Sequence, residues 1–156
     1  MLGIGNPLMT DDGVGIHVVR ALQAQRPFAP ERVEILDGGT LGYLLIDRVS
    51  GVDSIVVVDA ANMHAPPGSV KVLTGEALAA VLDDSGASSV HEAALADLLQ
   101  MMTLSGQAPR NLALVGVQPD RIEWGTELSE SLAGSVEAAS AAVRSVVRSW
   151  LETQPC

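Results

Sequence analysis

Three residues far apart in the sequence, Asp12, Asp59 and His91, have side chains and local settings typical of metal ligands. Asp11 and Asp12 precede an apolar-periodic helical segment, and the positive end of a helix dipole keeps a carboxylate ionised and able to bind a cation. One acid is enough to cap a helix, and Thr10 or Asp11 can serve as that cap. Asp12 is therefore the acid left to explain, with a solvated first-turn carboxylate as the equal alternative.

Asp59 and His91 are each predicted at the end of a secondary-structure element. Asp59 follows the apolar run 55–58, and ligands of parallel-sheet proteins bind beyond the carboxyl ends of the strands. Its alternative role is that of a strand-end acid capping a loop. Ser89 and Glu92 have capping-box spacing, which puts His91 in a first helical turn, where the dipole favours a neutral, metal-binding imidazole. A helix-start histidine with no partner is the alternative.

The segment Gly3-Ile4-Gly5-Asn6 invites comparison with dinucleotide-binding proteins, because it follows a short apolar segment and Asp37 ends the next predicted strand. Two features oppose nucleotide binding. The third glycine of the motif is missing, and Asp11 and Asp12 would repel a pyrophosphate at the helix start. A Gly-x-Gly pair alone is a weak signal, so nucleotide binding is kept only as a rival function.

Other catalytic arrangements do not match the sequence. The helix that begins at His91 has Leu95 where a zinc protease would have its second histidine, and the sequence has no Gly-x-Ser-x-Gly elbow. The single cysteine, Cys156, permits neither an intrachain disulfide nor a thiolate cluster. We expect His17, among apolar helical neighbours, to be structural or at the surface, and His64 to lie in a proline-rich loop from which it could approach the crevice.

Composition limits the classes of partner. The chain has 156 residues, of which 47% are hydrophobic and 18% charged, a balance typical of one globular domain spanning residues 1–156. A net charge of -10 disfavours nucleic acid and anionic membranes as partners. The aliphatic run 55–58 is far shorter than the roughly 20 residues that span a bilayer. We see no export signal at the start, and we expect a cytoplasmic protein.

Alternating strand-like and helical patterns predict an α/β protein, a three-layer α/β/α sandwich with a twisted, mostly parallel five-stranded sheet. The run 55–58 is apolar throughout, as in a central strand buried on both faces. The predicted strands are Met1 to Ile4, Val33 to Leu36, Ser54 to Val58, Ser69 to Leu73 and Asn111 to Val117. The predicted helices are Gly13 to Gln25, Leu41 to Val49, Glu76 to Leu82, His91 to Leu104 and Ser131 to Leu151.

Several of these segments occur together, and in order, in one family. The sequence resembles the hydrogenase maturation endopeptidases over nearly its whole length. The motifs that carry the resemblance are Gly3-Ile4-Gly5-Asn6, Asp11-Asp12-Gly13-Val14-Gly15, Asp37-Gly38-Gly39-Thr40, Val57-Val58-Asp59-Ala60, His91 and Leu114-Val115-Gly116-Val117-Gln118-Pro119. Members of this family usually have more residues before the first turn, so we expect a clipped first strand.

The resemblance implies an activity and a ligand set. It implies an α/β/α endopeptidase that removes the C-terminal extension of a nickel-iron hydrogenase large-subunit precursor after nickel insertion. By the same resemblance, Asp12, Asp59 and His91 are the nickel-binding and catalytic residues. The nickel is expected to come from the substrate, with other divalent ions as substitutes in vitro. Two carboxylates and one imidazole make an incomplete shell that leaves positions for substrate ligands.

The remaining expectations concern the peptide and the assembly. The loop Asp37-Gly38-Gly39-Thr40, with two adjacent glycines that allow close backbone approach, is our candidate for binding the substrate tail. Attack on the peptide bond is open between metal polarisation of the carbonyl, a metal-activated water and a carboxylate base. We expect a monomer. A non-catalytic nickel-sensing or chaperone module with the same crevice is the principal rival function.

Overall fold

The structure is a computed structural model that describes residues 1–40, 45–83 and 90–153, with side chains except at positions 83 and 90–94. Its strands form one sheet in the order β2-β1-β3-β5-β4, with β4 antiparallel to β5 and the other pairs parallel. The strands are β1 (Leu2–Gly3), β2 (Leu36–Asp37), β3 (Ser54–Ala60), β4 (Val70–Leu73) and β5 (Asn111–Val117). This confirms the predicted five-stranded, mostly parallel sheet.

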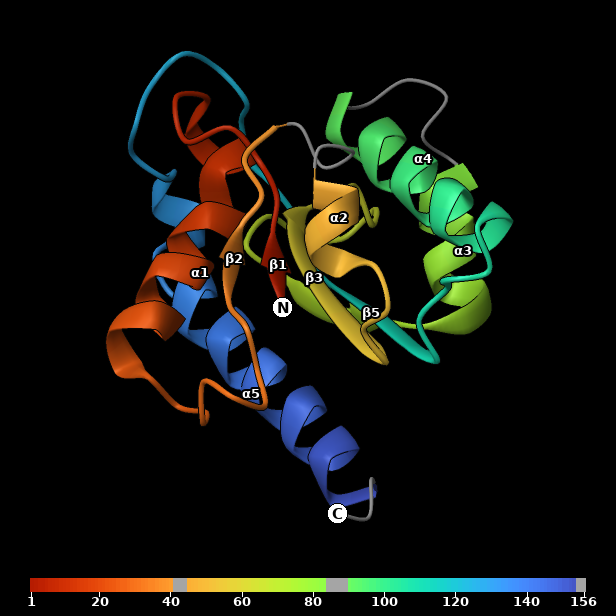
Figure 1. Ribbon diagram of the computed structural model, residues 1–156. Helices are drawn as coiled ribbons and strands as arrows, with labels where there is room; N and C mark the ends of the chain where they lie inside the picture. The colour runs from red at the N-terminus through yellow and green to blue at the C-terminus, as the bar shows by residue number, and fades with distance from the viewer. Residues whose placement is uncertain (41–44, 84–89, 154–156) are drawn as a thin grey trace.

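Helices cover both faces of the sheet (Figure 1). They are η1 (Thr10–Gly13), α1 (Val14–Gln25), α2 (Ile46–Val49), α3 (Gly75–Asp83), α4 (Val90–Leu104), η3 (Glu130–Leu132) and α5 (Ser135–Thr153). α1 and α5 pack on one face, and α2, α3 and α4 pack on the other. The three-layer α/β/α arrangement predicted from the sequence is therefore confirmed.

The apolar run of β3 supplies both cores because side chains alternate between the faces of a strand. Val56 and Val58 pack with α1 and α5, whereas Ile55 and Val57 pack with α2, α3 and α4. All four side chains are at most 5% exposed. Burial on both faces is the reason that this strand reads as a continuous apolar run rather than as an alternating one.

Two predicted strands are shorter than expected. β2 begins at Leu36 instead of Val33, and β1 is limited to Leu2–Gly3. In the described part of the chain, β2 is an edge strand that pairs only with β1, through Leu36 with Leu2 and Asp37 with Gly3, so the short β1 limits the ladder that β2 can form. The prediction for Val33 to Leu36 was wrong in its bounds because β propensity does not supply a pairing partner.

The helices deviate mainly at their ends. α5 begins at Ser135, because the 3-10 turn η3 occupies the start of the predicted helix. The predicted helix from Leu41 is described only from Leu45 onward, where α2 is confirmed as Ile46–Val49, and positions 41–44 lie outside the described residues. Ser89 of the predicted capping box also lies outside them. In the described part of the chain, no helix has the length and apolar character needed to cross a membrane.

Candidate functional site

The carboxyl ends of β1, β2 and β3 meet at one rim of the sheet. The Ile4 N–H donates to the Val58 carbonyl over 2.9 Å, and the Gly5 N–H donates to the Gly39 carbonyl over 2.9 Å. We call this end of the sheet the carboxyl rim. Crevices at such rims are where ligands bind in open α/β sheets, so the predicted placement of the site agrees with the topology.

Asp12 is held at the carboxyl rim by the turn that follows β1. Its Oδ2 atom accepts a hydrogen bond of 2.9 Å from the Asn6 N–H, and the residue is only 4% exposed. This contact fixes the carboxylate against the backbone rather than leaving it solvated. The alternative of a solvated first-turn acid at Asp12 is therefore wrong.

The glycines of the first motif make room for the chain's own backbone. A Cβ on Gly5 would come within 1.9 Å of the Asp12 carbonyl oxygen, and Gly5 has a φ of 135°. A Cβ on Gly15 would lie 2.2 Å from the Ile4 oxygen and 2.4 Å from the Val58 oxygen. The glycines thus let η1 and α1 pack directly on the sheet, which accounts for them without a nucleotide pyrophosphate.

Asp59 lies inside β3 and not after it, because the strand continues to Ala60. The predicted strand end at Val58 was too early. Asp59 pairs with Gly116 of β5 and is 2% exposed. By strand alternation its side chain belongs to the same face as Val57, the face that α4 covers. This place inside the ladder differs from the strand-end position that the loop-capping alternative assumed.

His91 lies in the first turn of α4, as predicted, and its side chain is outside the described part of the structure. α4 packs on the Asp59 face through Leu95, Leu98 and Met102. In Figure 1 its first turn lies at the upper end of the molecule, the end toward which β1 and β3 run. The first turn of α4, which carries His91, therefore lies in the layer that packs on the Asp59 face, and a site shared with Asp12 and Asp59 stays a prediction.

The described side chains do not by themselves complete a metal site. Among them, no group of three His, Cys, Asp or Glu residues is arranged to hold an ion, and the imidazole of His91 is not part of that set. Asp12 lies on η1 and Asp59 near the end of β3, and these two elements contact each other. Metal binding by Asp12, Asp59 and His91 stays a prediction.

The predicted tail-binding loop, Asp37 to Thr40, packs against the end of β1. Its Gly38 N–H donates to the Gly3 carbonyl over 2.8 Å, and a Cβ on Gly38 would come within 2.9 Å of that oxygen. Asp37 accepts the Gly39 N–H over 3.0 Å. The close approach allowed by Gly38 is thus made to β1, and substrate binding by Asp37, Gly38, Gly39 and Thr40 stays a prediction.

Asp11 has a structural role that the sequence did not reveal. It does not cap a helix, because no side-chain cap precedes η1 or α1. Its fully buried carboxylate instead accepts hydrogen bonds of 2.7 to 3.0 Å from the N–H groups of Asp120, Arg121 and Ser129 and from the Ser129 hydroxyl. Burial acts to raise the pKa of Asp11, but these hydrogen bonds outweigh it and leave that pKa below its ordinary value.

Thr10 also forms hydrogen bonds to the loop that follows β5. Like Asp11, it does not cap a helix. Its hydroxyl donates to the Arg121 carbonyl over 3.0 Å and accepts the Glu123 N–H over 3.1 Å. The loop that follows β5, residues 118–129, is thereby bound to the turn that carries Asp12. Such pairs, more than 100 residues apart, have no local sequence signal.

The remaining histidines lie on α1 and in the loop after β3. His17 is half-buried on α1, and burial together with the nearby Arg20 lowers its pKa. Among the described residues, its buried Nε2 atom has no hydrogen-bond partner. His64 is exposed in the loop between β3 and β4, as expected, and Cys156 lies outside the described residues.

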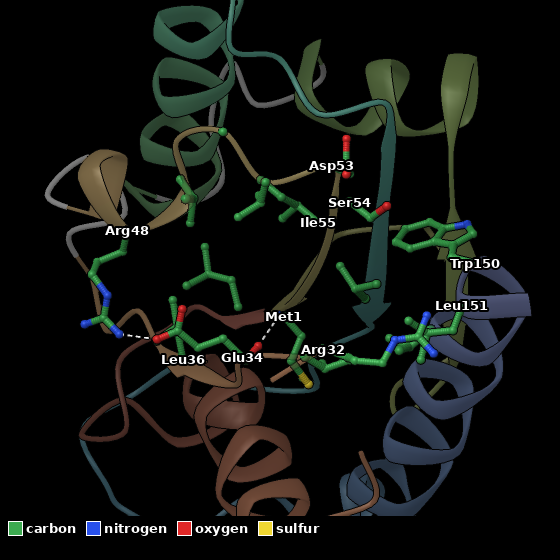
Figure 2. Close-up of a pocket in the computed structure, with 17 residues that line it drawn as sticks. Met1, Arg32, Glu34, Leu36, Arg48, Asp53, Ser54, Ile55, Trp150 and Leu151 are labelled. Carbon is green, nitrogen blue, oxygen red and sulfur yellow. Dashed lines mark hydrogen bonds and ion pairs between the residues drawn. The ribbon is translucent and has the colours of Figure 1, made fainter. Parts of the chain in front are cut away.

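A cavity of about 340 Å³ lies at the opposite end of the strands from the carboxyl rim. Its lining includes Met1, Ser54 and Ile55 from the starts of β1 and β3 and Trp150 from α5 (Figure 2). The dashed lines in Figure 2 join Arg48 to Glu34 and the Met1 ammonium group to the Glu34 carbonyl. This cavity is therefore separate from Asp12 and Asp59.

Comparison with known proteins gives a consistent result. A family model described as hydrogenase maturation protease matches residues 16–146. The chain is 35% identical over 149 residues to the hydrogenase 2 maturation protease of Escherichia coli K12, covering 95% of this chain and 89% of that protein. It is 33% identical to the hydrogenase expression/formation protein HoxM of Cupriavidus necator, over 96% of this chain and 73% of that protein.

Solved structures agree with the sequence relatives. The hydrogenase maturating endopeptidase HybD of Escherichia coli superposes with a TM-score of 0.86 at 35% identity, covering 95% of this chain and 90% of that one. The [NiFe] hydrogenase maturation protease HybD of Thermococcus kodakarensis gives a TM-score of 0.76 at 27% identity, covering 93% and 95%. Sequence and fold are thus shared over nearly the full length, so the chain is a peptidase and belongs to the hydrogenase maturation protease family.

Proposed function

We propose that this protein removes the C-terminal extension of a nickel-iron hydrogenase large-subunit precursor after nickel has been inserted. Asp12, Asp59 and His91 would recognise the nickel that the precursor carries. The observation that supports this most is the placement of two buried carboxylates, 4% and 2% exposed, on two elements that contact each other, η1 and β3, at the carboxyl rim. Buried carboxylates are normally paired with cations or coordinate metals, so this arrangement suits an incoming metal ion.

The donor set suits a metal that arrives with the substrate. Two carboxylates and one imidazole provide three ligands without a thiolate, which leaves coordination positions for ligands supplied by the precursor. Asp12 is fixed by the Asn6 N–H, and Asp59 is fixed by its place in the β3 ladder. Ligands with fixed positions would hold the nickel ion, and with it the precursor chain that carries the ion, at a defined place in the site.

The same residues would also place the scissile bond. We propose that Asp12 and Asp59 hold the precursor so that the extension passes the loop Asp37 to Thr40, which binds it as an extended segment. Gly39 has a φ of 53°, a conformation that favours glycine, and this sets the path of the loop. A metal at such a site supplies polarisation of the carbonyl or activation of a water.

The direct test is incubation of the purified protein with the large-subunit precursor, prepared with and without nickel. We expect a mobility shift of the nickel-loaded precursor and none of the nickel-free precursor. Asp12→Ala, Asp59→Ala and His91→Ala should each abolish the shift while leaving the unfolding temperature nearly unchanged. Cleavage of the nickel-free precursor would contradict nickel recognition, and an intact precursor in a stable complex would favour the non-catalytic module instead.

The setting of the reaction forms part of the proposal. The described helices include none able to cross a membrane, and the sequence contains a single cysteine, which suits a reducing compartment. We propose that the protein acts in the cytoplasm as a monomer. Sedimentation equilibrium of the purified chain would test the second point, and a concentration-dependent dimer mass would contradict it.

A further inference from the structure

Three large apolar side chains are exposed on two loops beside the carboxyl rim. Leu8, between β1 and η1, is 54% exposed, while Ile122 and Trp124, in the loop after β5, are 46% and 80% exposed. The backbones of the two loops are joined, because the Gly125 N–H donates to the Leu8 carbonyl over 3.0 Å. These three residues therefore share one end of the molecule, and we call them the Trp124 surface.

The Trp124 surface is built on a hydrogen-bonded support. Thr10 donates its N–H to the Gly125 carbonyl over 2.8 Å, and its hydroxyl bonds the backbone of Arg121 and Glu123 on either side of Ile122. These bonds fix the backbone on both sides of Trp124 before any partner arrives. Clustered exposed apolar side chains mark interaction sites, and preorganised tryptophans are common binding hot spots.

The same turn connects this surface to the candidate site. Thr10 and Asp11 bind the loop after β5, and the next residue along the chain is Asp12. Figure 1 shows η1 and the loop after β5 together at the upper end of the molecule. A partner bound on Trp124 is thus held at a set position relative to Asp12.

We propose that the Trp124 surface docks an apolar patch on the folded large-subunit precursor, beside the extension that enters the site. This rests on the proposed function, which requires the precursor to reach Asp12. The turn that carries Leu8 also carries Asp12, so a precursor that reaches Asp12 lies beside this surface. An apolar contact also suits a protein of net charge -10, because it does not require a basic partner.

The test compares two exposed residues of similar accessibility. Trp124→Ser should raise KM for the nickel-loaded precursor about tenfold or more and leave kcat unchanged at saturating precursor, because docking lies outside the reacting groups. Ile122→Ser should change KM in the same direction by a smaller factor. The matched control is Leu104→Ser, at the last residue of α4 and 81% exposed, which should change neither constant. Equal unfolding temperatures for all variants would show that the fold is intact.

A binding measurement separates docking from cleavage. Titration calorimetry measures precursor binding to the Asp59→Asn protein, with and without nickel in the precursor. The Asp59→Asn, Trp124→Ser double variant should bind the precursor more weakly than Asp59→Asn in both conditions. Unchanged KM and unchanged binding would overturn the docking proposal. A change in sedimentation mass without a change in precursor affinity would also overturn it and assign the surface to a second copy. Cleavage by the Asp59→Asn protein itself would refute the metal assignment, while the effect of Trp124→Ser would still decide docking.

Discussion

The carboxylate of Asp11 binds Ser129 twice, through the Ser129 N–H and the Ser129 hydroxyl, each over 2.7 Å. The two residues are separated by 118 positions in the sequence. This pair closes the loop after β5 onto the turn that begins η1. The two adjacent acids therefore have different roles. Asp11 joins two segments that are distant in the sequence, whereas Asp12 lies at the carboxyl rim.

Replacing Asp59 by Asn should lower the rate of precursor processing by about 100-fold or more, because an amide is a poor substitute for a buried carboxylate ligand. The shape of the side chain is kept, so the unfolding temperature should change little. Asp53→Asn is the matched control, since Asp53 precedes the same strand at the other end and its side chain is 64% exposed. Processing by Asp59→Asn at the rate of Asp53→Asn would refute the assignment.

Replacing Asp11 by Asn should lower the free energy of unfolding at pH 7 by about 2–4 kcal/mol, because buried donors lose a charged acceptor. Urea denaturation measures this loss. The hydrogen bonds of Asp11 leave its pKa lower in the folded protein than in the unfolded chain. The unfolded chain therefore binds more protons near pH 4, and stability rises with pH across that region.

The pH dependence of Asp11 gives a second measurement. Its contribution to stability is fully present above the ordinary pKa of an aspartate, about 3.9, and is lost as the pH falls through the lower folded value. The difference in urea midpoint between the native protein and Asp11→Asn should therefore shrink below about pH 4. A difference that stays constant down to pH 2 would contradict this account.

His17 should titrate below the ordinary histidine value of about 6.5, because burial and the charge of Arg20 both disfavour its protonated form. NMR titration of the imidazole carbon measures this pKa directly. Since the folded pKa lies below the unfolded value, stability falls as the pH drops below about 6.5 and levels off once the folded protein is also protonated. His17→Gln should lack this part of the slope, and a His17 pKa at or above 6.5 would exclude the effect.

A methyl group at Gly15 should cost about 3 kcal/mol of stability or more, because it would lie 2.2 Å from the Ile4 oxygen and 2.4 Å from the Val58 oxygen. Neither oxygen is on a flexible side chain, so α1 would have to move away from the sheet. Gly134→Ala is the matched control, since a Cβ there meets nothing within 4 Å. Thermal unfolding of the two variants should differ clearly, and equal unfolding temperatures would disprove this packing role.

Local sequence patterns predicted most of the fold. The strand Asn111–Val117 was confirmed with its predicted bounds, and α1 and α4 each begin one residue away from the prediction. The all-apolar run 55–58 identified the central strand, because a strand buried on both faces has no polar side. The order of strands and helices then implied a parallel sheet with a ligand-binding rim near Asp12 and Asp59, and the motifs indicated the family that the comparisons confirm.

Only the tertiary structure showed which partners the first motifs use. The sequence offered Thr10 or Asp11 as a helix cap and left the Gly3 to Asn6 segment open to a weak nucleotide-binding interpretation. The structure pairs Asp11 with Ser129 and places Gly5 against the Asp12 carbonyl. β2 is also shorter than the sequence predicted, because its pairing partner β1 has only two residues. Periodicity, capping and turn signals act over a few neighbouring residues, whereas these contacts join segments that meet only once the sheet and its helices have packed.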